Sequence, residues 1–206
     1  DYIGLNSLEE FHEIRDLVED VPVCLLGPTL PSQAAAVVAA GVEPTVSMLE
    51  TVAALAQAAR ATGRTVAIHI KAETGTHRQG VTLAEIPAWG DFLREHGEVR
   101  FRGLHTHFAN IEDTTDHSFA RRQMAQLSEA RRAFAAHGVA PELTHSACSA
   151  AAIVMPQTHR DLVRLGISSY GLWPSRETLL STLLTRVTDP DLMPVLSWHA
   201  RIAQIK

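Results

Sequence analysis

The sequence predicts an α/β barrel of parallel strands, and three observations support this fold class. Short apolar runs alternate with helical patterns along the chain, as in parallel βαβ units. At roughly 30 residues per unit, the 206 residues hold seven of the eight units of a (β/α)₈ barrel. No Gly-x-Gly-x-x-Gly turn follows any run, which disfavours the dinucleotide-binding form of a doubly wound sheet. We therefore expect a barrel that lacks its first strand–helix unit.

Seven segments are candidate strands, each an apolar run: residues 2–6, 21–27, 44–49, 65–71, 101–108, 142–148 and 162–170. Between them, apolar residues three and four apart predict helices. Residues 7–18 form one such helix, which Ser7 and Glu10 begin as a capping box. Residues 48–63 and 117–138 form two more, each ending at a glycine that favours a helix C-terminus, Gly63 and Gly138.

The last residues differ from the rest of the chain. After a proline-rich entry, Trp198, Ala200 and Ile202 alternate at period two, which predicts a strand of antiparallel type. We assign residues 1–190 to an incomplete barrel holding strands 2–8, and residues 191–206 to the start of a C-terminal β domain. The chain is thus expected to be cut at both ends.

Composition excludes several classes of function. The net charge is −5, so the chain has no basic field to hold nucleic acid or anionic lipid. There is no apolar run of transmembrane length and no signal peptide. Two cysteines far apart, Cys24 and Cys148, do not make a disulfide framework. We expect a cytoplasmic protein that binds neither nucleic acid nor membrane.

Ionisable residues gather where the predicted strands end, which is where barrels carry their active sites. Lys71 ends a strand and Arg78 follows seven residues later. A surface pair of either with Glu73 is the plain alternative. However, a lysine after five mostly apolar residues is expected to be buried, and two cations so close repel. One of them would have to be converted into an anion.

The last two predicted strands carry the pattern of an anion site, since barrels commonly bind phosphate in the loops after strands seven and eight. Ser149 opens a short helical turn whose N–H groups favour an anion. Gly166 lets the backbone approach closely, and Ile167 adds a neighbouring N–H group. A helix cap is the plain alternative for Ser149. His105 and His107 lie two apart and share a strand face.

Five blocks, at residues 69–81, 103–115, 144–153, 161–175 and 194–206, resemble alanine racemase in order and spacing. The resemblance implies an enzyme that binds pyridoxal 5'-phosphate, with an N-terminal (β/α)₈ barrel, a C-terminal β domain and a head-to-tail homodimer. It also implies a reaction, the interconversion of L- and D-alanine through an external aldimine by two-base proton transfer. The D-alanine would supply cell-wall peptidoglycan.

The resemblance assigns a role to each matching residue. Lys71 matches a lysine that carries a carbamate in many members, and this anion would hold Arg78 toward the cofactor's phenolic oxygen and the substrate carboxylate. His107 matches the histidine that packs at the cofactor ring and supports the arginine behind it. Arg164 matches that arginine, the donor to the pyridine nitrogen. The remaining matches are the phosphate cradle of Ser149, Gly166 and Ile167, Tyr170 after it, and Cys148, where many members have asparagine. His77 stands where a smaller residue is common.

Two catalytic groups of the family have no match. Its Schiff-base lysine lies in a Lys-Ala-(Asp/Asn)-Ala-Tyr-Gly type of motif, which does not occur in these 206 residues. Its second base is a tyrosine of the C-terminal domain, which neither Tyr2 nor Tyr170 matches. We expect these residues alone to be inactive.

Other functions stay open at this point. Another fold-type III racemase or lyase, acting on serine, lysine or ornithine, has the same cradle. A carbamylated Lys71 with His105, His107 and His145 suggests a metal-dependent barrel hydrolase, although Arg164 stands where such a barrel has an aspartate and would repel a metal. A non-catalytic barrel is the third alternative.

Overall fold

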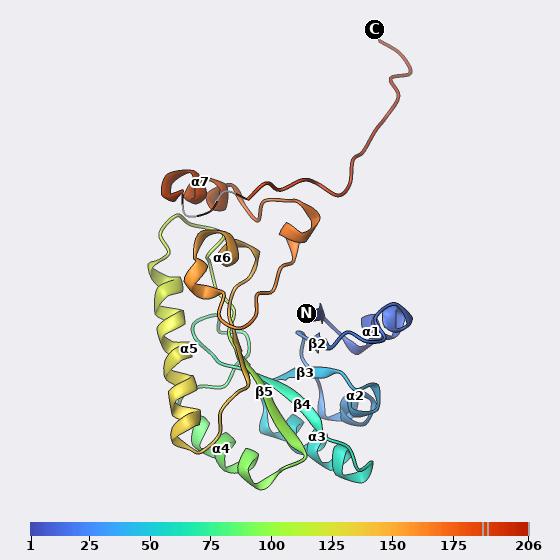
Figure 1. Ribbon diagram of the computed structural model, residues 1–206, viewed down its shortest axis with the longest axis vertical. Coiled ribbons are helices and arrows are strands. Elements are labelled where there is room, and N and C mark those ends of the chain that lie inside the picture. Colours follow the sequence, from blue (N-terminus) through green and yellow to red (C-terminus); the bar gives the residue numbers. More distant parts are fainter. Residues whose placement is uncertain (187, 189, 206) are drawn as a thin grey trace.

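Six parallel strands form one curled sheet in this computed structural model, which describes residues 1–186, 188 and 190–205. The strands pair in chain order, as β1 (Ile3–Leu5), β2 (Val23–Leu25), β3 (Glu43–Val46), β4 (Val66–Lys71), β5 (Val99–His105) and β6 (Leu143–His145). Each neighbouring pair is parallel. This order, with one strand following the next round the curve (Figure 1), confirms six of the seven predicted strands and the barrel class.

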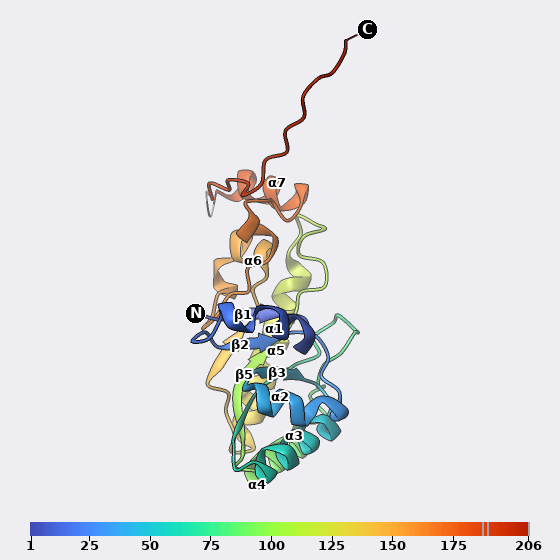
Figure 2. The same ribbon diagram turned by 90° about the vertical axis from the view of Figure 1, so that its right-hand side faces the viewer.

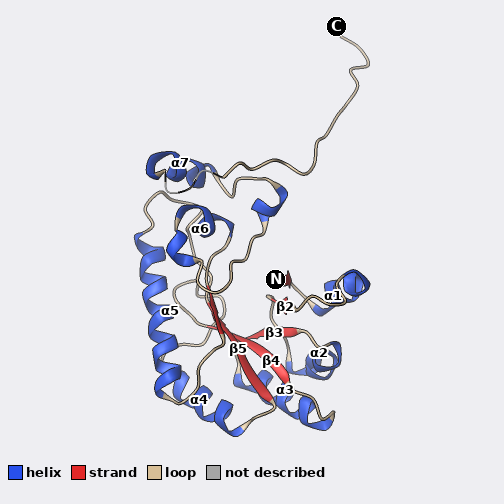
Figure 3. Cartoon of the chain, viewed as in Figure 1, coloured by secondary structure: helices blue, strands red, loops and turns tan. Residues whose placement is uncertain are grey.

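The first five helices connect the strands and cover the outside of the curve, and the last two follow the final strand and lie beyond the strand ends (Figure 3). The helices are α1 (Leu8–Ile14), α2 (Ala34–Ala40), α3 (Leu49–Ala61), α4 (Ile86–Glu95), α5 (Ser118–Ala136), α6 (Ser149–Val154) and α7 (Arg176–Thr185). None of the described helices is long and apolar enough to cross a membrane. The main core lies between these helices and the strands, around Ile68, Ile70, Leu55 and Phe134. A smaller core surrounds Phe108, Ala151 and Met155 beneath α6.

The predicted helix ends are largely confirmed. The Ser7 hydroxyl accepts a hydrogen bond from the Glu10 N–H at the start of α1. The Glu10 carboxylate accepts from the Asn6 N–H, one residue before the Ser7 N–H that a capping box would use. Gly63 and Gly138 have φ values of 63° and 77°, in the left-handed region that ends helices.

The seventh predicted strand, residues 162–170, is wrong. A single parallel bridge joins Leu162 to His145, and the segment then enters a 3₁₀ helix at Ile167–Tyr170. The physical reason is that the N–H groups of Gly166 and Ser168 donate to the Ser149 hydroxyl instead of to a neighbouring strand.

The strand predicted around Trp198 is not formed in the described residues either. Residues 190–205 carry no strand. The Val195 N–H still donates to the Tyr170 carbonyl, and the residues after it run away from the body of the molecule (Figures 1 and 2). Trp198 is 91% exposed. An isolated strand has no partner for its N–H and C=O groups, so it does not persist alone. The division into a barrel of residues 1–190 and a second domain from 191 stays a prediction.

Polar side chains fill the inside of the curve. His69, Lys71, His105, Thr45 and His145 are all buried on the strands. Burying so many polar groups is costly unless each is satisfied. Their partners therefore define the site.

Candidate functional site

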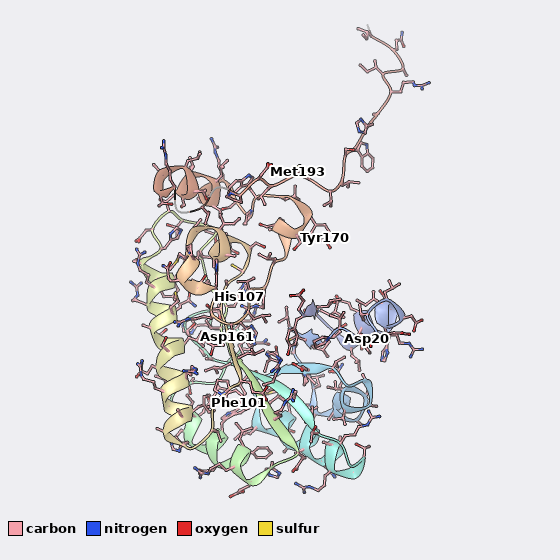
Figure 4. The ribbon with its side chains drawn as sticks, viewed as in Figure 1. Asp20, Phe101, His107, Asp161, Tyr170 and Met193 are labelled. Carbon is pink, nitrogen blue, oxygen red and sulfur yellow. The ribbon has the colours of Figure 1, made fainter. Side chains whose placement is uncertain are left out.

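A cavity of about 990 Å³ opens beside the carboxyl ends of the strands, within reach of the usual size of ligand pockets. Eight of the nine residues that the resemblance assigns to the site line it: Lys71, Arg78, His107, Cys148, Ser149, Arg164, Gly166 and Ile167. Tyr170 does not line it. Tyr170 is 63% exposed and lies nearer to Met193 than to His107 (Figure 4). Its backbone carbonyl accepts a hydrogen bond from the Val195 N–H.

Arg164 is fixed from several directions. Its guanidinium donates to Nδ1 of His145 at 2.5 Å and to the carbonyl oxygens of Thr106 and Ser146 at 2.7 and 3.2 Å. Its backbone N–H donates to the Ala147 carbonyl. Burial lowers the pKa of Arg164 to about 10, so the group keeps its charge at neutral pH. Arg164 is therefore a fixed cationic donor at the wall of the cavity.

The support expected from His107 comes from another residue. Among the described residues no hydrogen bond joins His107 to Arg164, and His145 takes that place. Burial, together with the nearby Arg164 and Arg78, lowers the pKa of His107 to about 4, so this ring is neutral. Its backbone carbonyl accepts from the buried Gln123 amide at 3.0 Å. The sequence pattern had raised His145 only as a metal ligand.

The two loops predicted to bind an anion do meet. The Ser149 hydroxyl accepts from the N–H groups of Gly166 at 3.0 Å and Ser168 at 3.4 Å. A Cβ added at Gly166 would stand in open space, so the missing side chain leaves room beside the hydroxyl. Ser149 is the first residue of α6, directly after the N-cap residue Cys148. Its hydroxyl connects the loop before α6 to the loop that contains Gly166 and Ser168.

Lys71 and Arg78 line the same cavity, and Lys71 is only 2% exposed. Burial and then the charge of Arg78 lower the pKa of Lys71 to about 8. Glu73 does not pair with either cation, because its carboxylate accepts from the N–H groups of Gly75 and His77. The plain surface pair is therefore not formed. His77 sits at φ 50°, in the left-handed region that histidine adopts more often than most residues.

The cavity suits an anionic ring-sized group better than a metal ion. The side chains of Lys71, Arg78 and Arg164 bring cationic nitrogen to its wall, and Ser149 adds a hydroxyl beside open space. Within the described ranges, no group of three or more His, Cys, Asp or Glu side chains is placed to hold a metal. The ring nitrogens of His145 are already taken by Arg164 and His69. Pyridoxal phosphate, with its phosphate and ring, fits the residues present.

Fold and site together define a parallel barrel protein with a cavity at its strand ends that is lined by cationic side chains and by Ser149. The family model for the alanine racemase N-terminal domain matches residues 1–174, and the chain belongs to this family. It is 35% identical to the alanine racemase of Desulfovibrio desulfuricans over 205 residues, which is 100% of this chain and 53% of that protein. For the alanine racemase of Symbiobacterium thermophilum the identity is 32%, over 100% of this chain and 52% of that protein.

Solved structures agree with this placement. The alanine racemase from D-cycloserine-producing Streptomyces lavendulae superposes with a TM-score of 0.80 at 30% identity, over 89% of this chain and 48% of that one. The Bacillus anthracis enzyme with bound L-Ala-P gives 0.81 at 26% identity, over 93% and 48%. The chain therefore spans about half the length of these relatives.

Proposed function

We propose that this chain is the cofactor-binding part of an alanine racemase, which interconverts L- and D-alanine with pyridoxal 5'-phosphate. One observation carries the proposal: a fixed guanidinium, a serine–glycine cradle and a Lys71–Arg78 pair line one cavity at the strand ends. The names of the relatives support the same reaction. The reaction would take place in the cytoplasm, and its product D-alanine would be used to build cell-wall peptidoglycan.

The residues of this chain would hold and tune the cofactor. In this proposal Arg164 donates to the pyridine nitrogen, and because guanidinium keeps its protons the nitrogen stays unprotonated. Ser149, Gly166 and Ile167 hold the phosphate, while His107 packs against the ring beside Cys148. When bound, pyridoxal phosphate supplies the electron sink for the substrate Cα. The contact predicted for Tyr170 stays a prediction.

Lys71 and Arg78 would form the substrate side of the site. A neutral Lys71 amine that attacks carbon dioxide and loses a proton gives a carbamate. This anion would neutralise Arg78 and orient it toward the substrate carboxylate, which replaces a repulsion by an ion pair. The pKa of Lys71, lowered to about 8 by burial and Arg78, favours the neutral amine that this step needs.

The two proton-transfer groups would come from outside these residues. The lysine motif of the family does not occur in the 206 residues, so a lysine and a tyrosine elsewhere in the active homodimer would remove and return the Cα proton. We propose that the 206 residues alone do not racemise alanine.

The test is cofactor binding and racemisation by the complete protein. Pyridoxal phosphate absorbance measures binding, and chiral chromatography measures D-alanine formed from L-alanine. We expect Arg164→Gln to lower kcat about 100-fold, since it removes a preorganised charged donor. Arg121→Gln, on the exposed side of α5, is the matched control and should have no effect. An unchanged rate in Arg164→Gln, or no racemisation at all, contradicts the proposal.

A further inference from the structure

Three hydrogen bonds in series connect Arg164 to the carboxylate of Glu43, on β3. Arg164 contacts Nδ1 of His145 at 2.5 Å, Nε2 of His145 contacts Nδ1 of His69 at 2.9 Å, and Nε2 of His69 contacts the Glu43 carboxylate at 2.8 Å. Both imidazoles are 0% exposed. Water therefore does not compete for any of these ring nitrogens.

The two ends fix the direction of every hydrogen bond in the series. A guanidinium only donates, and an ionised carboxylate only accepts. Consequently Nδ1 of His145 accepts from Arg164, and its Nε2–H donates to Nδ1 of His69. The Nε2–H of His69 then donates to Glu43. Both rings are neutral in this arrangement, and each carries its proton on Nε2.

The charges agree with this direction. Burial, followed by the charge of Arg164, holds the pKa of His145 well below its usual range. Burial would raise the pKa of Glu43, but the hydrogen bonds with His69 and Tyr2 and the nearby Arg102 outweigh it and lower that pKa. Glu43 is thus ionised at the acceptor end.

The packing of β5 leaves space for the hydrogen bond between His69 and His145. His69 lies on β4 and His145 on β6, so the His69 ring must cross the strand between them. It crosses at Gly103 of β5, where an added Cβ would collide with the imidazole. His105 stacks on His145 with ring centroids 4.6 Å apart and an interplanar angle of 7°. These contacts leave each ring one orientation.

Arg164 makes no ion pair with a carboxylate among the described residues. A largely desolvated charge needs compensation, yet a carboxylate in direct contact would occupy the donors that face the cavity. We propose that Glu43 is the remote counter-ion and positioning residue of Arg164, and that it acts through the neutral His69–His145 pair. Of this proposal, only the identity of the ligand that Arg164 contacts rests on the proposed function.

The first test needs no activity. Nitrogen-15 NMR of histidine-labelled complete protein distinguishes protonated from unprotonated ring nitrogens. We expect unprotonated Nδ1 and protonated Nε2 in both His69 and His145. A proton on Nδ1 of His145, or an imidazolium at either position, would overturn the proposal. This result stands whether or not the protein racemises alanine.

The second test asks whether Glu43 acts through Arg164. Glu43→Gln should shift the His145 ring signals and lower kcat about tenfold, as loss of an outer partner does. In an Arg164→Gln background the same substitution should change kcat less than about twofold, because its target is gone. Glu142→Gln is the matched control, since Glu142 pairs with Arg100 and Arg102 but not with His69.

Two outcomes of the second test contradict the proposal. One is full additivity of Glu43→Gln with Arg164→Gln, and the other is an equal loss in Glu142→Gln. If Glu43→Gln does not fold, the tautomers of the unsubstituted protein decide. Absence of racemisation by the unsubstituted protein would contradict the proposed function and leave the tautomer result intact.

Discussion

At the scale of single residues, Lys71 is a buried amine whose charged form destabilises the folded protein. Its folded pKa of about 8 lies below the value of 10.5 for an exposed amine, because of burial and then Arg78. Between these pH values the unfolded chain binds a proton that the folded chain does not, so stability rises as pH increases through this window. Below pH 8 the folded chain carries a charged, buried Lys71, and the loss of stability that this causes is fully present.

Lys71→Met removes that loss of stability. We expect the variant to be more stable than the unsubstituted protein by about 2 kcal/mol at pH 7 in buffer free of carbon dioxide, since an apolar side chain suits a buried site. The difference should shrink toward pH 10. Urea unfolding at both pH values measures it, and a difference independent of pH would show that Lys71 is not the titrating group.

The same amine predicts a carbon dioxide adduct. With labelled bicarbonate present, we expect one carbamate carbon signal in the carbon-13 NMR spectrum, which Lys71→Met abolishes. Arg78→Gln should weaken the signal, since it removes the cation that stabilises the anion. A carbamate that persists in Lys71→Met would place the modification on another amine.

At the scale of elements, β5 depends on one glycine. Gly103 is buried and lies under the His69 ring, where a Cβ has no room. We expect Gly103→Ala to lower the free energy of unfolding by about 2 kcal/mol through overpacking. Gly97→Ala is the control, because a Cβ there meets no atom within 4 Å, and its effect should stay within about 0.5 kcal/mol. Equal effects of the two changes would contradict this explanation of Gly103.

Elements also show how far sequence reasoning reaches. Apolar runs located six strands, and the rule that barrels act at strand ends brought together Lys71, Ser149 and Arg164, which are far apart in the chain. The segment at 162–170 misled because its N–H groups serve the Ser149 hydroxyl, a tertiary contact that no periodicity reports. The sequence did not predict that Glu43 and His69 support Arg164, because the hydrogen bonds that connect them to it join residues on different strands.

At the scale of the whole molecule, the ends of the sheet and its apolar surface decide how the 206 residues behave alone. The terminal strands β1 and β6 are three residues long each, and short edges pair poorly with other chains. Several large apolar side chains, by contrast, are exposed to solvent: Leu165 is 53% exposed, Leu196 75% and Trp198 91%. Association should therefore proceed through apolar contact more than through strand pairing.

We expect the 206-residue chain, expressed alone, to elute from size-exclusion columns as species larger than a monomer and to bind the dye ANS. Replacing Leu196 and Trp198 together with serine should reduce both effects, because it removes two highly exposed apolar side chains of the tail, Trp198 being the most exposed of them. Thr185→Ser, at the exposed end of α7, is the control and should change neither. If the double variant associates as strongly as the unsubstituted chain, apolar contact through the tail does not cause the association.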